Sequence, residues 1–223
     1  MSILRGILND PYSFLINMLC SLPAILIAFS FHEWAHAYSA YKLGDPTARN
    51  LGRMTVNPLR HIDPIGFATL LLFGFGWAKP VPVNPRNFKN YRKDDIIVSL
   101  AGVATNFVLA IVGVFAINLF FVFNGSNEII YRMLIYFCSI NLSLMIFNLI
   151  PIPPLDGSHV LESLLIRKVG PKPFLFLSKY GYLILIILMF TGIIGDVLGL
   201  GVSAIYSGLN KMVGGLFRAI GLY

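Results

Sequence analysis

Charged residues are absent from long stretches of this chain, and these stretches predict membrane-spanning helices. The three longest uncharged runs cover residues 11–31, 96–127 and 133–155. A spanning helix needs roughly 20 apolar residues, so each of these runs is long enough to cross a bilayer. Two further runs, residues 180–195 and 197–210, flank Asp196 and predict additional spans near the C-terminus.

A shorter uncharged run, residues 64–78, is too short for an ordinary span. Basic segments lie on both sides of it, so we expect this run to dip into the membrane and return. The predicted fold is an all-α polytopic membrane protein with about 4–6 transmembrane helices. A re-entrant or extended element is expected between its first and second full spans.

The composition supports a membrane protein and excludes most other classes. Hydrophobic residues make up 57% of the chain and charged residues 12%, against about 45–50% and about 25% in soluble domains. So few charges cannot cover a soluble particle of this size, and a disordered chain would be far less apolar. The first apolar run continues unbroken to residue 31 without a cleavage site, so we interpret it as a retained span rather than a signal peptide.

The net charge of +7 is explained by the placement of the basic residues. Thirteen of the 17 lie in residues 42–60, 79–93 and 167–179, each beside an apolar run. Cations concentrate in cytoplasmic loops and contact anionic headgroups. We therefore expect all three segments to face the cytoplasm at a lipid bilayer, and we expect no nucleic-acid partner. The N-terminus and the cation-free turn at residues 123–128 should lie outside.

The first span ends in the sequence H-E-x-x-H, formed by His32, Glu33 and His36. Residues four apart lie one above the other on a helix, so both imidazoles can bind one metal ion. In this pattern the glutamate is the general base of a zinc metalloprotease. The alternative is a pair of interfacial histidines beside an exposed glutamate. It is disfavoured because a charge within a span costs about 2.5–3.5 kcal/mol on insertion scales and usually marks function.

Catalytic zinc sites usually have three protein ligands, so a third ligand is needed. The candidates are Asp45, His61, Asp63, Asp156, His159, Glu162 and Asp196. Asp156 is favoured because it follows Pro151, Pro153 and Pro154, which must break the incoming helix. Unwound backbone at membrane depth is tolerated where it lines a cavity. Asp156 would alternatively act as the N-cap of a helix over residues 157–167, which is compatible with ligation.

These motifs together resemble the site-2 protease family of intramembrane zinc metalloproteases. The resemblance rests on His32–His36, on the stretch from Asn148 through Asp156 to Gly157, and on residues 44–64 and 76–85, which are similar to compact members without a PDZ domain. It implies one zinc ion per chain, held by His32, His36 and Asp156. It also implies Glu33 as the catalytic base and Asn148 as a residue that holds or polarises the scissile peptide.

The resemblance covers roughly residues 22–200 and implies a single integral-membrane metalloprotease domain over residues 1–223, with its core at residues 11–200. One departure is Val103, where the family's middle-helix motif would have proline. We expect it to affect packing rather than chemistry. Gly102 and Asn106 in the same motif lie four apart and are expected to form a close helix contact.

The function implied is hydrolysis of peptide bonds in or near transmembrane segments of membrane proteins. The enzyme would be a multi-pass protein of the cell membrane, with its active site toward the cytoplasmic side. The proline-rich residues 80–85 would either receive a substrate as an added strand or form a plain extended loop. The rival functions are a membrane metal transporter or metal-binding channel protein, and a non-catalytic scaffold with structural zinc.

Overall fold

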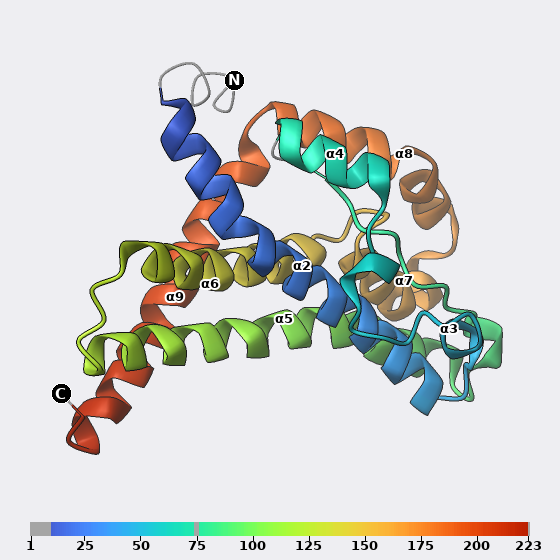
Figure 1. Cartoon of the computed structure of the whole chain (residues 1–223). Helices are drawn as coiled ribbons and strands as arrows, with labels where there is room; N and C mark the ends of the chain where they lie inside the picture. The colour runs from blue at the N-terminus through green and yellow to red at the C-terminus, as the bar shows by residue number, and fades with distance from the viewer. Residues whose placement is uncertain (1–9, 74–75, 223) are drawn as a thin grey trace.

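The computed structural model describes residues 10–73 and 76–222, which form helices joined by short loops (Figure 1). In chain order the α-helices are α2 (Pro11–Lys42), α3 (Thr47–Asn50), α4 (Pro64–Phe73), α5 (Tyr91–Val122), α6 (Glu128–Asn148), α7 (Asp156–Val169), α8 (Lys172–Phe190) and α9 (Ile193–Ala219). Two short 3₁₀ helices, η1 (Pro58–Arg60) and η2 (Pro85–Asn87), lie in the loops before α4 and α5.

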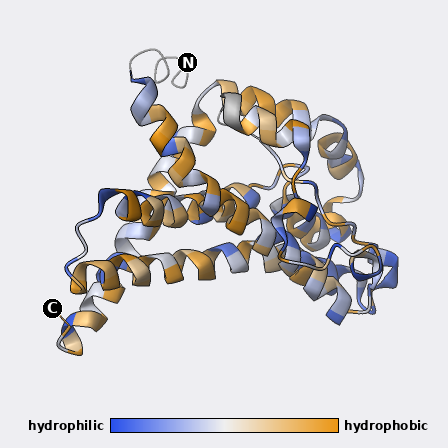
Figure 2. Cartoon of the chain, viewed as in Figure 1, coloured by the Kyte–Doolittle hydropathy of each residue, from blue (hydrophilic) through white to orange (hydrophobic). Residues whose placement is uncertain are grey.

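Five of the described helices are long and apolar enough to cross a membrane, namely α2, α5, α6, α8 and α9. Figure 2 shows hydrophobic residues along much of the length of these helices. Large apolar side chains such as Val108 and Phe190 are 57% and 90% exposed, as expected for residues that face lipid. The prediction of an all-α polytopic membrane protein is confirmed.

The short uncharged run contains α4, which is too short to cross a bilayer as a helix. Its ten helical residues extend about 15 Å, half of the roughly 30 Å hydrocarbon core. An antiparallel bridge joins Ile62 to Ala78 on either side of it, and the Lys79 amide donates to the His61 carbonyl at 2.8 Å. The chain therefore leaves and returns at one place, which is the geometry expected of a re-entrant element.

The apolar core lies between α5, α6 and α9. Val114 of α5 and Leu142 of α6 are fully buried there, together with Val213 of α9. Val103 also packs in this core, as expected of a residue that affects packing. The helix α2 packs across α5 and α6 (Figure 1). This crossing brings the C-terminal half of α2 against the N-terminal half of α5.

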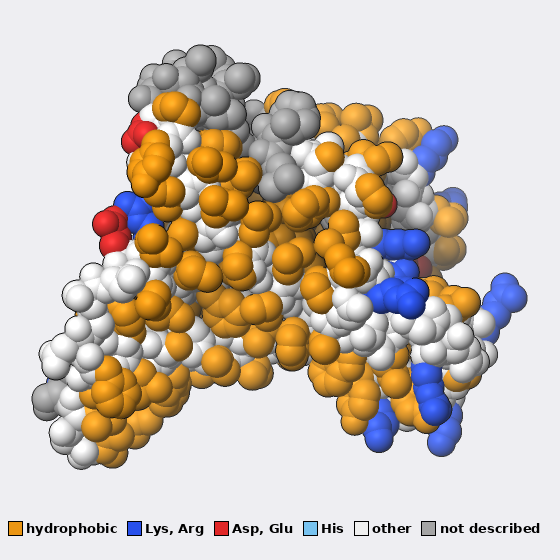
Figure 3. All heavy atoms as spheres, viewed as in Figure 1, with side chains coloured by type: hydrophobic (Ala, Val, Ile, Leu, Met, Phe, Trp, Pro, Cys, Tyr) orange, Lys and Arg blue, Asp and Glu red, His pale blue; other side chains and the backbone are white. Residues whose placement is uncertain are grey.

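Basic side chains gather at one end of the molecule. On the face shown in Figure 3, Lys and Arg cluster at the end where α3 lies, whereas hydrophobic side chains cover most of the remaining surface. The end of α2 and the start of α5 meet at this end (Figure 1). This separation of charged and apolar surface is typical of a protein with one end at the headgroups.

Candidate metal centre

Two imidazoles from the buried face of α2 form the base of the site. His32 and His36 are 5% and 8% exposed and lie one helical turn apart. Their Nε2 atoms are 3.0 Å apart. The i, i+4 spacing therefore places two potential ligand atoms side by side, as the sequence predicts.

The carboxylate of Asp156 completes a group of three potential ligands. The helix α6 ends at Asn148, ahead of the three prolines, and α7 begins at Asp156. Oδ2 of Asp156 lies 3.3 Å from Nε2 of both His32 and His36. The N-cap of α7 is Leu155 rather than Asp156, so the alternative role of this carboxylate as a helix cap is wrong.

The donor set fits a zinc ion. Oδ2 of Asp156 is buried without a hydrogen-bond partner, which is costly unless a cation lies against it. Ligand atoms placed about 2.0–2.1 Å from a tetrahedral zinc lie about 3.3–3.4 Å apart. The three distances here are 3.0, 3.3 and 3.3 Å. Two imidazoles and one carboxylate in this arrangement leave a fourth position open, as catalytic zinc sites do.

The helix α5 supports the imidazoles from behind. Nδ1 of His36 lies 2.8 Å from the backbone carbonyl of Val98, and Nδ1 of His32 lies 2.6 Å from Oδ1 of Asn106. A carbonyl only accepts, so Nδ1 of His36 carries the proton and Nε2 presents its lone pair to the ligand group.

Between these two contacts, Gly102 allows the helices to approach. A Cβ atom at Gly102 would lie 2.6 Å from Cε1 of His32 and from Nε2 of His36. The close helix contact expected of Gly102 and Asn106 is therefore made, and it is made with the two histidines.

The carboxylate of Glu33 is buried beside the ligands and is held by the backbone. Its Oε2 atom accepts a hydrogen bond of 2.7 Å from the amide of Val81, and the side chain is 8% exposed. Val81 lies between Pro80 and Pro82, in an extended segment. Nη2 of Arg53 donates to the carbonyls of Lys79 and Pro80 at 2.7 and 3.3 Å, which fixes this segment over Glu33.

Asp45 anchors the same segment farther along and takes no part in the ligand group. It is fully buried and accepts from the Asn84 amide and the Asn87 side chain at 2.7 Å, and from the Thr47 hydroxyl. Burial by itself raises the pKa of the Asp45 carboxyl, but these hydrogen bonds outweigh it and hold the pKa below its usual value. Asp45 is therefore an ionised structural anchor.

These anchors bear on whether residues 80–85 can accept a substrate as an added strand. The amides of Lys79, Val81 and Asn84 donate within the chain, to His61, Glu33 and Asp45. The prolines in the segment have no amide hydrogen. Only a short stretch of edge is left for strand addition, so these contacts favour the plain extended loop.

The remaining candidates for the third ligand have other surroundings. Nε2 of His61 lies 2.7 Å from the carbonyl of Thr55, and Asp63 caps α4 through the amides of Ile65 and Gly66. His159 lies 3.8 Å from Asp95, while Glu162 and Asp196 are exposed. Among the described residues, the metal-binding group contains His32, His36 and Asp156.

Asn148 lies at the last residue of α6 and turns its amide back on its own helix. Its Nδ2 donates to the carbonyl of Leu144 at 3.0 Å, which leaves Oδ1 available as an acceptor. This hydrogen bond neither requires nor excludes contact between Asn148 and a substrate. The role of Asn148 in holding or polarising the scissile peptide therefore stays a prediction.

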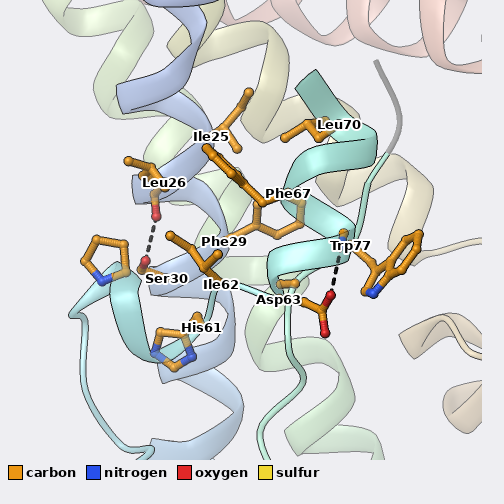
Figure 4. Close-up of a pocket in the computed structure, with 13 residues that line it drawn as sticks. Ile25, Leu26, Phe29, Ser30, His61, Ile62, Asp63, Phe67, Leu70 and Trp77 are labelled. Atoms are coloured by element: carbon orange, nitrogen blue, oxygen red, sulfur yellow. Dashed lines mark hydrogen bonds between the residues drawn. The ribbon is translucent and has the colours of Figure 1, made fainter. Parts of the chain in front are cut away.

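A largely apolar pocket lies between α2 and α4, one turn before Glu33 (Figure 4). Ile25 and Phe29 of α2 and Phe67 and Leu70 of α4 line it together. Ser30, the polar residue of α2 in this lining, donates its hydroxyl to the carbonyl of Leu26. The pocket thus presents apolar side chains close to the catalytic motif.

Sequence reasoning expected only a helix contact from Asn106 and missed Asn141, and it did not show that these residues support a histidine ligand. Asn106 and Asn141, which lie on different helices and are both fully buried, form a hydrogen bond of 2.9 Å next to His32. Their signal in the sequence is an uncharged but strongly polar side chain within a long apolar run, which is costly in a bilayer unless it is paired.

The sequence is similar to those of known proteins. Residues 124–191, which include Asp156, match the profile of peptidase family M50. The chain is 36% identical over 201 residues to the "Putative zinc metalloprotease YwhC" of Bacillus subtilis, covering 88% of this chain and 91% of that protein. It is 27% identical over 190 residues to the "Putative zinc metalloprotease Rip2" of Mycolicibacterium smegmatis, covering 81% and 70%.

A third relative is archaeal. The "Putative zinc metalloprotease MJ0611" of Methanocaldococcus jannaschii is 34% identical over 158 residues, which are 70% of this chain and 76% of that protein. No solved structure matches the chain significantly. The match to YwhC extends over nearly the full length of both proteins and confirms the resemblance drawn from the motifs: this chain belongs to peptidase family M50, the site-2 protease family.

Proposed function

We propose that this protein is an intramembrane zinc metalloprotease that hydrolyses peptide bonds in or near transmembrane segments of other membrane proteins. The observation that carries the proposal is the carboxylate of Asp156. It lies without a hydrogen-bond partner against two imidazoles of the apolar helix α2. The residue that follows His32 on α2 is a buried glutamate. Membership in a peptidase family supports hydrolysis rather than metal transport.

One zinc ion per chain would be held by His32, His36 and Asp156. When bound there, zinc supplies a water of lowered pKa and polarises the scissile carbonyl. His32 and His36 are only 5% and 8% exposed at this position, and such burial strengthens electrostatic interactions within the site.

Glu33 is assigned the role of general base. Its Oε2 atom is held by the Val81 amide, so we assign proton transfer to Oε1. The carboxylate accepts a proton from the attacking water and delivers it to the leaving amine. Because Val81 is fixed by its neighbours' contacts with Arg53, the carboxylate keeps its orientation through both transfers.

The substrate is proposed to be a transmembrane segment that unwinds near the site, because a helix hides its carbonyls in hydrogen bonds. The pocket between α2 and α4 would accept an apolar side chain of this segment next to Glu33. Asn148 would hold or polarise the scissile peptide through its amide group. Residues that weaken a helix should therefore favour cleavage when placed in the substrate.

A reconstituted assay separates this function from metal transport. We expect the purified chain in lipid vesicles to cleave a reporter with a single transmembrane segment. A chelator should reduce cleavage to background and zinc should restore it. A zinc-sensitive dye inside the vesicles should show no flux above that of empty vesicles. Zinc flux without cleavage of any reporter would support the transporter and overturn the proposal.

We further propose that the protein lies in the cell membrane with its active site toward the cytoplasm. Single cysteines placed in residues 42–60, 79–93 and 167–179 should all be labelled from the cytoplasmic side, because these segments carry 13 of the 17 basic residues. A cysteine in the turn at residues 123–127 should be labelled from outside and serves as the control. Labelling of residues 79–93 from outside would show that the segment containing α4 crosses the membrane.

A further inference from the structure

A chain of buried amides runs from the zinc-ligand candidate His32 into the middle of the helix bundle. Asn106 of α5 and Asn141 of α6 are both fully buried. Oδ1 of Asn106 lies 2.6 Å from Nδ1 of His32, and Nδ2 of Asn106 donates to Oδ1 of Asn141 at 2.9 Å. Nδ2 of Asn141 then donates to the carbonyl of Phe137 at 2.8 Å.

The last hydrogen bond in this series, from Asn141 to Phe137, fixes the direction of all the others. The carbonyl of Phe137 can only accept, so the NH₂ group of Asn141 must face it. Oδ1 of Asn141 is then turned toward Asn106 and requires a donor there. The NH₂ group of Asn106 supplies that donor, and it also faces the carbonyl of Ala28 at 3.3 Å.

The orientation of Asn106 in turn decides the tautomer of His32. With its NH₂ group directed at Asn141, Asn106 presents only an acceptor to the imidazole. Nδ1 of His32 must therefore carry the proton, and Nε2 keeps its lone pair toward His36 and Asp156. If Asn106 were reversed, its NH₂ group would face Nδ1 and would favour the tautomer that is protonated at Nε2, which cannot bind a metal through Nε2.

We propose that Asn106 and Asn141 are positioning residues for the metal centre, which together hold His32 in the tautomer and ring orientation that binds zinc. This inference rests on the proposed zinc site. Asn106 acts directly on the ligand, whereas Asn141 acts only through Asn106. Both amides lie in a bilayer-spanning bundle where water is scarce, so each lost partner leaves a polar group that water does not easily satisfy.

The zinc affinity of the full-length purified protein tests this relay, in which Asn141 orients Asn106 and Asn106 orients His32. Asn106→Leu should weaken zinc binding about 10- to 100-fold, as loss of an outer partner of a metal-binding histidine does. Asn141→Leu should weaken it about 2- to 10-fold, which corresponds to one net hydrogen bond. Asn106→Asp keeps an acceptor toward His32 and should bind zinc more tightly than Asn106→Leu.

The double variant distinguishes a relay from a general loss of packing. Because Asn141 acts only through Asn106, Asn106→Leu/Asn141→Leu should bind zinc about as tightly as Asn106→Leu alone. Asn118 is a matched control, since it is a buried asparagine on α5 that contacts Asn210 of α9, far along the helix from the histidines. Asn118→Leu should leave zinc affinity unchanged even if it lowers the thermal stability of the chain.

The outcomes are separable from those of the proposed function. Wild-type affinity in Asn141→Leu, or additive losses in the double variant, would overturn the relay while leaving the zinc site intact. A wild-type chain that does not bind zinc at all would overturn the proposed function and the relay together. Should Asn141→Leu fail to fold, Asn141→Ala lacks the same acceptor without adding volume and is compared in its place.

Discussion

Asp156→Ala is expected to abolish both zinc binding and peptide cleavage. The substitution removes one of three ligand atoms, Oδ2, which lies 3.3 Å from each imidazole Nε2. Losing a ligand should weaken zinc binding by more than the about 10- to 100-fold that loss of an outer partner costs. Metal content after dialysis against a zinc buffer, measured beside cleavage of a transmembrane reporter, checks both effects.

Two other aspartates provide controls for Asp156→Ala. Asp63 caps α4 through the amides of Ile65 and Gly66, and Asp196 is exposed in the first turn of α9. Asp63→Ala and Asp196→Ala should both retain zinc. If Asp156→Ala bound zinc as tightly as wild type while one of these two did not, the third ligand would be misassigned.

The ligand group was predictable because local rules determine each of its parts. The spacing of His32 and His36 places both imidazoles on one face of any helix, whatever surrounds it. Three prolines within four residues before Asp156 end the helix, because each lacks an amide hydrogen and clashes with the preceding turn. The expected depth of His32 and of the proline break follows from the lengths of the apolar runs before them, at about 1.5 Å per residue.

The supporting contacts were not predictable in the same way. The contact between His32 and Asn106 joins residues 74 positions apart, and that between Glu33 and Val81 joins residues 48 positions apart. Each depends on the rotation and register of α5 or of an irregular loop against α2. Apolar periodicity does not specify these quantities in a membrane, since both lipid and neighbouring helices are apolar. Gly102 signals a close approach in the sequence, but the sequence does not show that histidines lie opposite it.

The arrangement around Glu33 has a consequence for how the site remains polar inside the membrane. Arg53 and Asp45 do not touch the ligand group, yet they hold the extended segment that carries the Val81 amide. That amide supplies a hydrogen bond to a buried carboxylate and lowers the cost of keeping it charged. The loop between α2 and α4 therefore contributes to the proposed chemistry by fixing one backbone donor.

Glu33→Gln is expected to retain zinc and to lose cleavage almost completely. A glutamine oxygen can still accept from the Val81 amide, so the side chain should keep its position. An amide cannot take a proton from water at neutral pH, and removal of a general base costs about 10²- to 10⁴-fold in rate. Metal content and cleavage rate are measured on the same preparation, because a loss of rate without a loss of zinc is the result that identifies the base.

Glu162→Gln is the matched control for this substitution, because Glu162 is exposed on α7, less than two turns after Asp156. Glu162→Gln makes the same change of charge at this end of the protein. Its cleavage rate should stay within about 2-fold of wild type, since substitutions of exposed residues outside the site usually have small effects. Equal losses in both variants would mean that the rate follows the net charge of this end of the protein. Retained turnover in Glu33→Gln, with zinc confirmed in the protein, would contradict the proposed hydrolytic mechanism, because that mechanism assigns the proton transfer to Glu33.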